Sequence, residues 1–143
     1  MLRLSKLTDY STVIMSYMAR EPWDVHSAAG VAAAVGMAPT TASKILKTLA
    51  RRQLVRSLRG AKGGYVLARP PAQISVAEVI DAMEGEFGLT ECCVHAGLCA
   101  QECACPTRGN WQRVSRMVHG VLAGVTLADM SRAATAQPRT ADR

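Results

Sequence analysis

The sequence predicts a mostly α-helical fold, namely a winged helix-turn-helix domain with a two-stranded wing and a long C-terminal dimerisation helix. Three observations lead to it: two helical patterns separated by Gly36, two strand-like runs joined by a basic glycine-rich segment, and a late apolar seam at helical spacing. We expect four parts: a winged domain over 1–85, a cysteine-rich loop over 86–109, a dimerisation helix over 110–130 and a disordered tail over 131–143.

The first three helices follow from apolar periodicity and from residues that break helices. The first is expected over 8–20 and ends before Pro22, because the residue before a proline avoids the helical region. The second is expected over 27–35, where Gly36 interrupts it. The third is expected over 39–52, with a proline that the first turn of a helix tolerates.

A hairpin and a fourth helix complete the predicted winged domain. Strand-like runs cover 54–58 and 65–68, and the glycines between them permit a tight turn. Ser75 and Glu78 form a capping-box pattern that begins a short helix ending near Gly85.

The positive charge is concentrated in the N-terminal half. The chain carries a net charge of +6. Through Arg69 there are eleven Lys or Arg and three acids (+8), whereas from Pro70 onward there are six Arg and eight acids (−2). This asymmetry is typical of a phosphate-binding module, although a merely solvated basic surface would look the same.

The third helix and the wing together predict binding to double-stranded DNA. Short hydroxyl and amine side chains suit base edges and phosphates, and a basic hairpin tip suits an adjacent groove. The predicted DNA-binding residues are Thr40, Thr41, Ser43, Lys44 and Lys47 on the helix, and Arg59 and Lys62 in the wing.

All five cysteines lie between Cys92 and Cys105, which in a reducing compartment predicts metal or redox chemistry. Thiolates select zinc, copper(I) or iron–sulfur clusters, and the Cys-x2-Cys knuckles of structural zinc sites are missing. A polynuclear cluster is therefore favoured, and a zinc site and a metal-free thiol switch stay open as alternatives. His95 is a candidate fourth ligand.

The late apolar seam predicts a helix that needs a partner. Its members alternate in steps of three and four: Trp111, Val114, Val118, Val121 and Val125. The alternative is that the helix packs back on its own domain. From the seam we expect a homodimer. We expect neither a membrane span nor a signal peptide, and therefore a cytoplasmic protein. No catalytic constellation is found, which predicts no enzyme and no small-molecule substrate.

The chain resembles the Rrf-type winged helix-turn-helix regulators, the family of IscR- and NsrR-like proteins, over residues 1 to about 130. Thr90-Glu91-Cys92 and Asn110-Trp111 look most similar to regulators of the SUF iron–sulfur assembly system. The other matching segments are Thr8-Asp9-Tyr10, Leu54-Val55, Arg59-Gly60, Gly63-Gly64-Tyr65, the cysteine loop and Thr126-Leu127-Ala128-Asp129-Met130.

The resemblance implies a homodimer on operator DNA that holds an iron–sulfur cluster, 2Fe-2S rather than 4Fe-4S. The ligands of the relatives fall on Cys92, Cys99 and Cys105, with Cys93 as an alternative to Cys92. Cys103 is a further alternate that matches no position of the family.

The fourth ligand is open. The histidine that some relatives use would fall on Arg108, which does not ligate iron. An aspartate from the first helix of the partner subunit serves in others, and it matches Asp9. Asp9 can instead act only as a first-turn charge on its own helix.

From these expectations we predict a regulator that senses iron–sulfur status and represses cluster-assembly genes of SUF type. The same fold could instead serve a repressor that senses nitric oxide or thiol oxidation. A protein of another class, an iron–sulfur electron carrier or cluster carrier, would show no salt-sensitive affinity for DNA.

Overall fold

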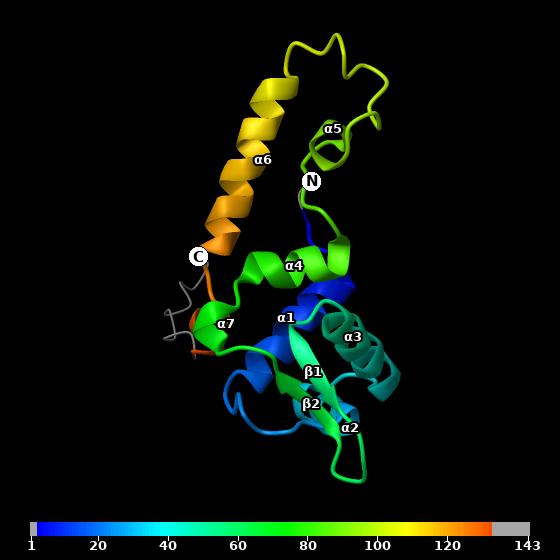
Figure 1. Cartoon of the computed structure of the whole chain (residues 1–143), viewed down its shortest axis with the longest axis vertical. Helices are drawn as coiled ribbons and strands as arrows, with labels where there is room; N and C mark the ends of the chain where they lie inside the picture. The colour runs from blue at the N-terminus through cyan, green and yellow to red at the C-terminus, as the bar shows by residue number, and fades with distance from the viewer. Residues whose placement is uncertain (1–2, 133–143) are drawn as a thin grey trace, which may run out of the picture.

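The computed structural model describes residues 3–132 and consists of a winged domain from which one long helix stands out (Figure 1). The elements are α1 (Lys6–Met18), α2 (Ala28–Val35), α3 (Pro39–Arg51), β1 (Val55–Leu58), β2 (Gly64–Leu67), a 3-10 turn (Pro71–Gln73), α4 (Val76–Glu84), α5 (Glu91–Val94), α6 (Arg108–Ala123) and α7 (Leu127–Ser131). The mostly helical fold with an antiparallel two-stranded wing is confirmed.

The core of the winged domain lies between α1, α2, α3, α4 and the base of the wing. Ile14, Met15, Ile45, Leu46 and Leu49 are completely buried, because the apolar stripes of α1 and α3 face each other. This core fixes the orientation of α3, whose opposite face stays exposed.

Two glycines shape the winged domain. Gly36 ends α2 in the left-handed region, with φ of 70°, where side chains other than glycine are strained. A Cβ at Gly63 would lie 2.3 Å from the carbonyl oxygen of Leu58, so the tip of the wing closes only with glycine there.

The C-terminal helix differs from the expected range of 110–130. It begins earlier, at Arg108, and ends at Ala123, and a second helix, α7, starts at Leu127. Thr126 and Asp129 form a capping box that begins α7, so the two helices are separate.

The short helix α7 packs on the winged domain. Leu127 is completely buried in the domain core, and its amide donates to the carbonyl of Ile74 over 2.9 Å. Thr126 pairs with Ser75 in an isolated β-bridge. The chain that leaves the domain at α4 therefore returns to it after α6.

Two further segments differ from or extend the expectations. The cysteine-rich segment, expected to be a loop over 86–109, contains the single turn α5. Ser131, the first residue of the predicted tail, ends α7, and residues 133–143 of that tail lie outside the described part. Between residues 3 and 132, no helix is long and apolar enough to cross a membrane.

Candidate DNA-binding surface and cysteine segment

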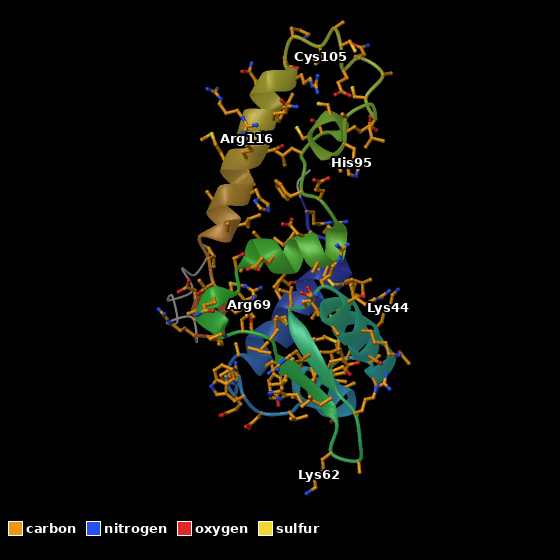
Figure 2. The ribbon with its side chains drawn as sticks, in the orientation of Figure 1. Lys44, Lys62, Arg69, His95, Cys105 and Arg116 are labelled. Atoms are coloured by element: carbon orange, nitrogen blue, oxygen red, sulfur yellow. The ribbon has the colours of Figure 1, made fainter. Side chains whose placement is uncertain are left out.

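The exposed face of α3 carries most of the predicted DNA-binding side chains. Thr40, Lys44 and Lys47 are exposed, and Thr41 and Ser43 are half-buried. Thr40, Ser43, Lys44 and Lys47 line a shallow groove with residues of α2 and with Arg51. Figure 2 shows Lys44 pointing away from the body. The helix thus presents hydroxyls and amines along one face, as a recognition helix requires.

The wing adds positive charge at its tip. Arg59 and Lys62 are both exposed, and Lys62 lies at the outermost point of the hairpin (Figure 2). The hairpin pairs Val55 with Leu67 and Leu58 with Gly64, which directs the tip away from the core. A cationic tip beside a recognition helix can reach a neighbouring groove or phosphate.

The loop before α2 holds the wing beside the helix-turn-helix. The amides and carbonyls of His26 and Tyr65 exchange two hydrogen bonds of 2.8 Å each. A Cβ at Gly64 would lie 2.5 Å from the His26 carbonyl oxygen, so this close approach needs glycine. The spacing between wing and recognition helix is therefore fixed by backbone contacts.

The first two cysteines share one hydrogen-bonding partner. The Thr90 hydroxyl lies 3.2 Å from the Cys92 sulfur and 3.1 Å from the Cys93 sulfur. Hydrogen bonds from the hydroxyls of Ser115 and Thr90 hold the pKa of the Cys93 thiol below its usual value. The Thr90 hydroxyl is therefore within hydrogen-bonding distance of both candidates for the first ligand.

The remaining cysteines lie along the loop. Cys99 and Cys105 are half-buried and Cys103 is exposed. The hydroxyl and amide of Thr107 lower the pKa of the Cys105 thiol, which favours the thiolate that binds metals. Figure 2 shows Cys105 near the start of α6, at the opposite end of the molecule from the tip of the wing.

An ion pair braces the loop that carries these cysteines. Glu102 pairs with the guanidinium of Arg108 and also accepts a hydrogen bond from the amide of Gly97. The side chain of Glu102 is only 10% exposed. Arg108, at the position of the histidine ligand of some relatives, therefore joins the start of α6 to the cysteine loop through an ion pair.

The structure does not gather the candidate ligands into one set. No three His, Cys, Asp or Glu side chains of residues 3–132 are close enough together to hold a metal ion. The donor chemistry still fits an iron–sulfur cluster, because the cysteines are free thiols and two of them have lowered pKa values. Binding a cluster would require the loop to close.

The two other candidate ligands also lie apart from the cysteines. The imidazole Nδ1 of His95 is 3.2 Å from a carboxylate oxygen of Glu86, and both side chains are exposed. Asp9 is exposed in the first turn of α1 and faces a hollow shared with Tyr17 and Met130. Within residues 3–132, neither side chain belongs to a group of three that could hold a metal ion.

Sequence reasoning missed the contacts that attach α6 to the rest of the chain. Ser115 is 5% exposed and its hydroxyl accepts a hydrogen bond of 3.1 Å from the Leu89 amide. His119 lies 2.8 Å from a carboxylate oxygen of Asp81 on α4. The only available signal was a pair of polar residues four positions apart within an apolar seam.

Comparison with known protein families identifies the family of this chain. The family described as "Rrf2: Iron-dependent Transcriptional regulator" matches residues 4–133. This chain belongs to the Rrf2 family. The Rrf-type resemblance predicted from the sequence is thereby confirmed.

Several Rrf2 relatives are similar over nearly their whole length. The HTH-type transcriptional regulator NsrR of Halalkalibacterium halodurans is 28% identical over 131 residues, which cover 90% of each chain. The structure of CymR, titled the global cysteine regulator of B. subtilis, matches with a TM-score of 0.71 and 28% identity over 92% of this chain and 97% of that one. The IscR structure from T. potens matches with a TM-score of 0.66 and 29% identity over 90% of this chain and 85% of that one.

Other relatives are covered less completely. The chain is 36% identical to the HTH-type regulator ORF2 of Azotobacter vinelandii over 104 residues, which are 73% of this chain and 63% of ORF2. It spans about half of a meningococcal HTH-type regulator. These Rrf2 relatives are named as transcriptional regulators rather than enzymes.

Proposed function

We propose that this Rrf2 protein is a cytoplasmic, homodimeric transcriptional repressor that senses iron–sulfur status and controls SUF-type cluster-assembly genes. One observation carries the proposal: a basic winged helix lies at one end of the molecule, a thiol-rich segment lies at the other, and α6 joins them (Figure 2). Two separate sites on one chain are the minimum that an allosteric regulator needs.

The proposed DNA contacts follow from the exposed faces of α3 and the wing. On α3, the hydroxyls of Thr40, Thr41 and Ser43 and the amines of Lys44 and Lys47 would enter a major groove. Arg59 and Lys62 would contact the flanking backbone or minor groove. Such contacts make operator affinity strongly dependent on salt.

The proposed homodimer rests on the uncovered face of α6. Trp111, Met117 and Val121 are 44%, 65% and 69% exposed, respectively, and Val114 lies between them at 37%. Large apolar side chains aligned along one helix are typical of an interface. The α6 helix of a second chain would cover them and place two recognition helices on one operator.

The proposed cluster would be held by Cys92, Cys99 and Cys105, with Cys93 as the alternative first ligand. When bound, an iron–sulfur cluster of 2Fe-2S type supplies a redox-active centre. The chain supplies the positioning: Thr90 orients the first cysteines, and the Glu102–Arg108 pair holds the loop before Cys105. Asp9 of the partner subunit is the proposed fourth ligand.

Binding to DNA by protein with and without a cluster tests the proposal. Anaerobically purified protein would be assayed for iron and sulfide and by visible absorption, and a binding duplex would be selected from a random library. We expect a cluster, salt-dependent binding, and an affinity that differs between the loaded and empty forms. Identical affinity of the two forms would refute the sensing claim and leave DNA binding intact.

A second candidate is a regulator of the same fold that responds to nitric oxide or to thiol oxidation. The observation in its favour is five free thiols within one segment, of which Cys103 is exposed. Single substitutions of Cys92, Cys99 and Cys105 separate the candidates: each abolishes the absorption of a cluster, whereas a disulfide switch depends on one specific pair. A cluster carrier would bind DNA only weakly and without selectivity.

A further inference from the structure

Two polar contacts on one face attach the middle of α6 to the rest of the chain, in addition to the ion pair of Arg108 with Glu102 at its start. Ser115 is the only buried residue of this helix, and its hydroxyl accepts a hydrogen bond from the Leu89 amide over 3.1 Å. His119 follows one helical turn later and bonds the Asp81 carboxylate at 2.8 Å. Residues four positions apart lie on the same side of a helix, about 6 Å from each other along its axis.

The two contacts reach different parts of the protein. Leu89 precedes Thr90, whose hydroxyl lies within 3.2 Å of the sulfurs of Cys92 and Cys93. Asp81 belongs to α4, which packs on α1 and α3 of the winged domain. Ser115 therefore connects α6 to the cysteine segment, and His119 connects it to the DNA-binding domain.

A cavity of about 500 Å³ brings these groups together beside α6. Its lining includes Asp81, Cys93, Ser115 and His119. The ring of Phe87 lies 5.5 Å from that of His119 and fills one side of the junction. Open space at this junction allows α6 to change its position without a clash in a packed core.

The contact between His119 and Asp81 is the only hydrogen bond found for the Asp81 side chain within residues 3–132. Within residues 3–132, the second carboxylate oxygen of Asp81 is buried and has no hydrogen-bond partner, so the loss of His119 removes the one bond that this side chain makes. The side chains of Asp81 and His119 are 37% and 38% exposed, so the bond between them contributes about as much as one ordinary hydrogen bond. Its loss would leave α6 more weakly attached to α4.

We propose that Ser115 and His119 are positioning residues through which α6 couples the state of the cysteine segment to the winged domain. This inference rests on the proposed sensing function. Closing the loop around a cluster would displace Thr90 and Leu89, and Ser115 would transmit that displacement to α6. One turn further on, His119 transmits it to α4, and so to the angle of α3.

The test measures the affinity of the selected operator duplex for loaded and empty protein, in the wild type, in four single variants and in one double variant. Ser115→Ala and His119→Ala should each bring the ratio of the two affinities about two- to tenfold closer to one, the factor that one hydrogen bond contributes. The affinity of the empty forms should stay within about twofold of the wild type. Ser115→Thr keeps the hydroxyl and should retain the ratio, as should the control Gln112→Ala, which lines the same cavity.

The double variant separates a single route from two independent ones. If both residues act in one connection, Ser115→Ala combined with His119→Ala changes the ratio no more than the stronger single substitution. Additive effects would overturn the single connection. If the double variant keeps the wild-type ratio of loaded to empty affinity, the coupling alone is overturned. If the wild-type protein itself shows a ratio of one, the sensing function is overturned.

A second measurement needs no cluster. Amide hydrogen exchange of the empty protein should show Leu89 protected in the wild type and in Ser115→Thr, and exposed to exchange in Ser115→Ala. His119→Ala should leave Leu89 protected. An unprotected Leu89 amide in the wild type would overturn the proposed contact and the inference with it.

Discussion

Replacing Leu127 by alanine should destabilise the whole winged domain, although this residue follows α6 in sequence. The side chain is completely buried in the same core as Ile14 and Leu49. Truncating a leucine at such a site costs about 2–5 kcal/mol, because apolar contacts are lost and a cavity remains. Met130 lies on the same short helix but is 46% exposed. Met130→Ala should therefore cost less than about 1 kcal/mol.

Urea unfolding of the empty protein measures both effects. All proteins must be compared at one concentration, because the stability of the proposed dimer would depend on concentration. A lower midpoint with an unchanged slope would report a loss of stability rather than a change in the unfolded state. Equal and small effects of Leu127→Ala and Met130→Ala would refute the docking of α7 on the winged domain.

The remaining predictions concern the wing and acid stability. Arg59→Ala should weaken operator binding and reduce the slope of log affinity against log salt by about one, while Arg113→Ala on α6 leaves the slope unchanged. Gly63→Ala should weaken operator binding about tenfold or more, with unchanged helix content by circular dichroism, because its Cβ would lie 2.3 Å from a carbonyl oxygen of the wing. Hydrogen bonds, the strongest from the Thr8 hydroxyl, hold the pKa of the Glu84 carboxyl below its usual value. The ionised Glu84 carboxylate therefore stabilises the folded protein at neutral pH, and this stabilisation is lost as the pH falls through the pKa of the folded state. The difference in unfolding free energy between wild type and Glu84→Gln should accordingly shrink as the pH is lowered from about 7 to about 3; a constant difference would contradict this.

The winged domain could be predicted because its local signals agree with one another. Apolar periodicity predicted every end of the first three helices to within two residues, Gly36 marked the turn, and the Ser75–Glu78 capping box marked the start of α4. Each of these signals acts over a few residues, so no knowledge of distant contacts was needed.

The division between α6 and α7 was missed although the sequence contains its signal. Thr126 and Asp129 form the same kind of capping box as Ser75 and Glu78. The apolar seam continued to Val125 and favoured one uninterrupted helix. The tertiary contact of Leu127 with the domain core then decided between the two readings.

The geometry of the cysteine segment could not be derived from spacing. Cys92 and Cys93 share the Thr90 hydroxyl, whereas Cys99, Cys103 and Cys105 lie along a loop whose shape depends on Glu102 and Arg108. The contacts of Ser115 and His119 likewise join residues 26 and 38 positions apart. Such contacts follow from how the elements pack, which no local pattern specifies.

Because the chain returns to the winged domain at Thr126, α6 can act as an arm that tilts about its C-terminal end. The chain just after its last turn is joined to the domain, because Thr126 pairs with Ser75, whereas its first turn follows directly from the cysteine loop. The arm has 16 residues and is therefore about 24 Å long, so a tilt of about 10° at the hinge displaces the far end by about 4 Å. If the proposed cluster draws the thiols together by a few ångströms, a rotation of this size at the base would accommodate the change, and in the proposed dimer two such rotations would add across the operator.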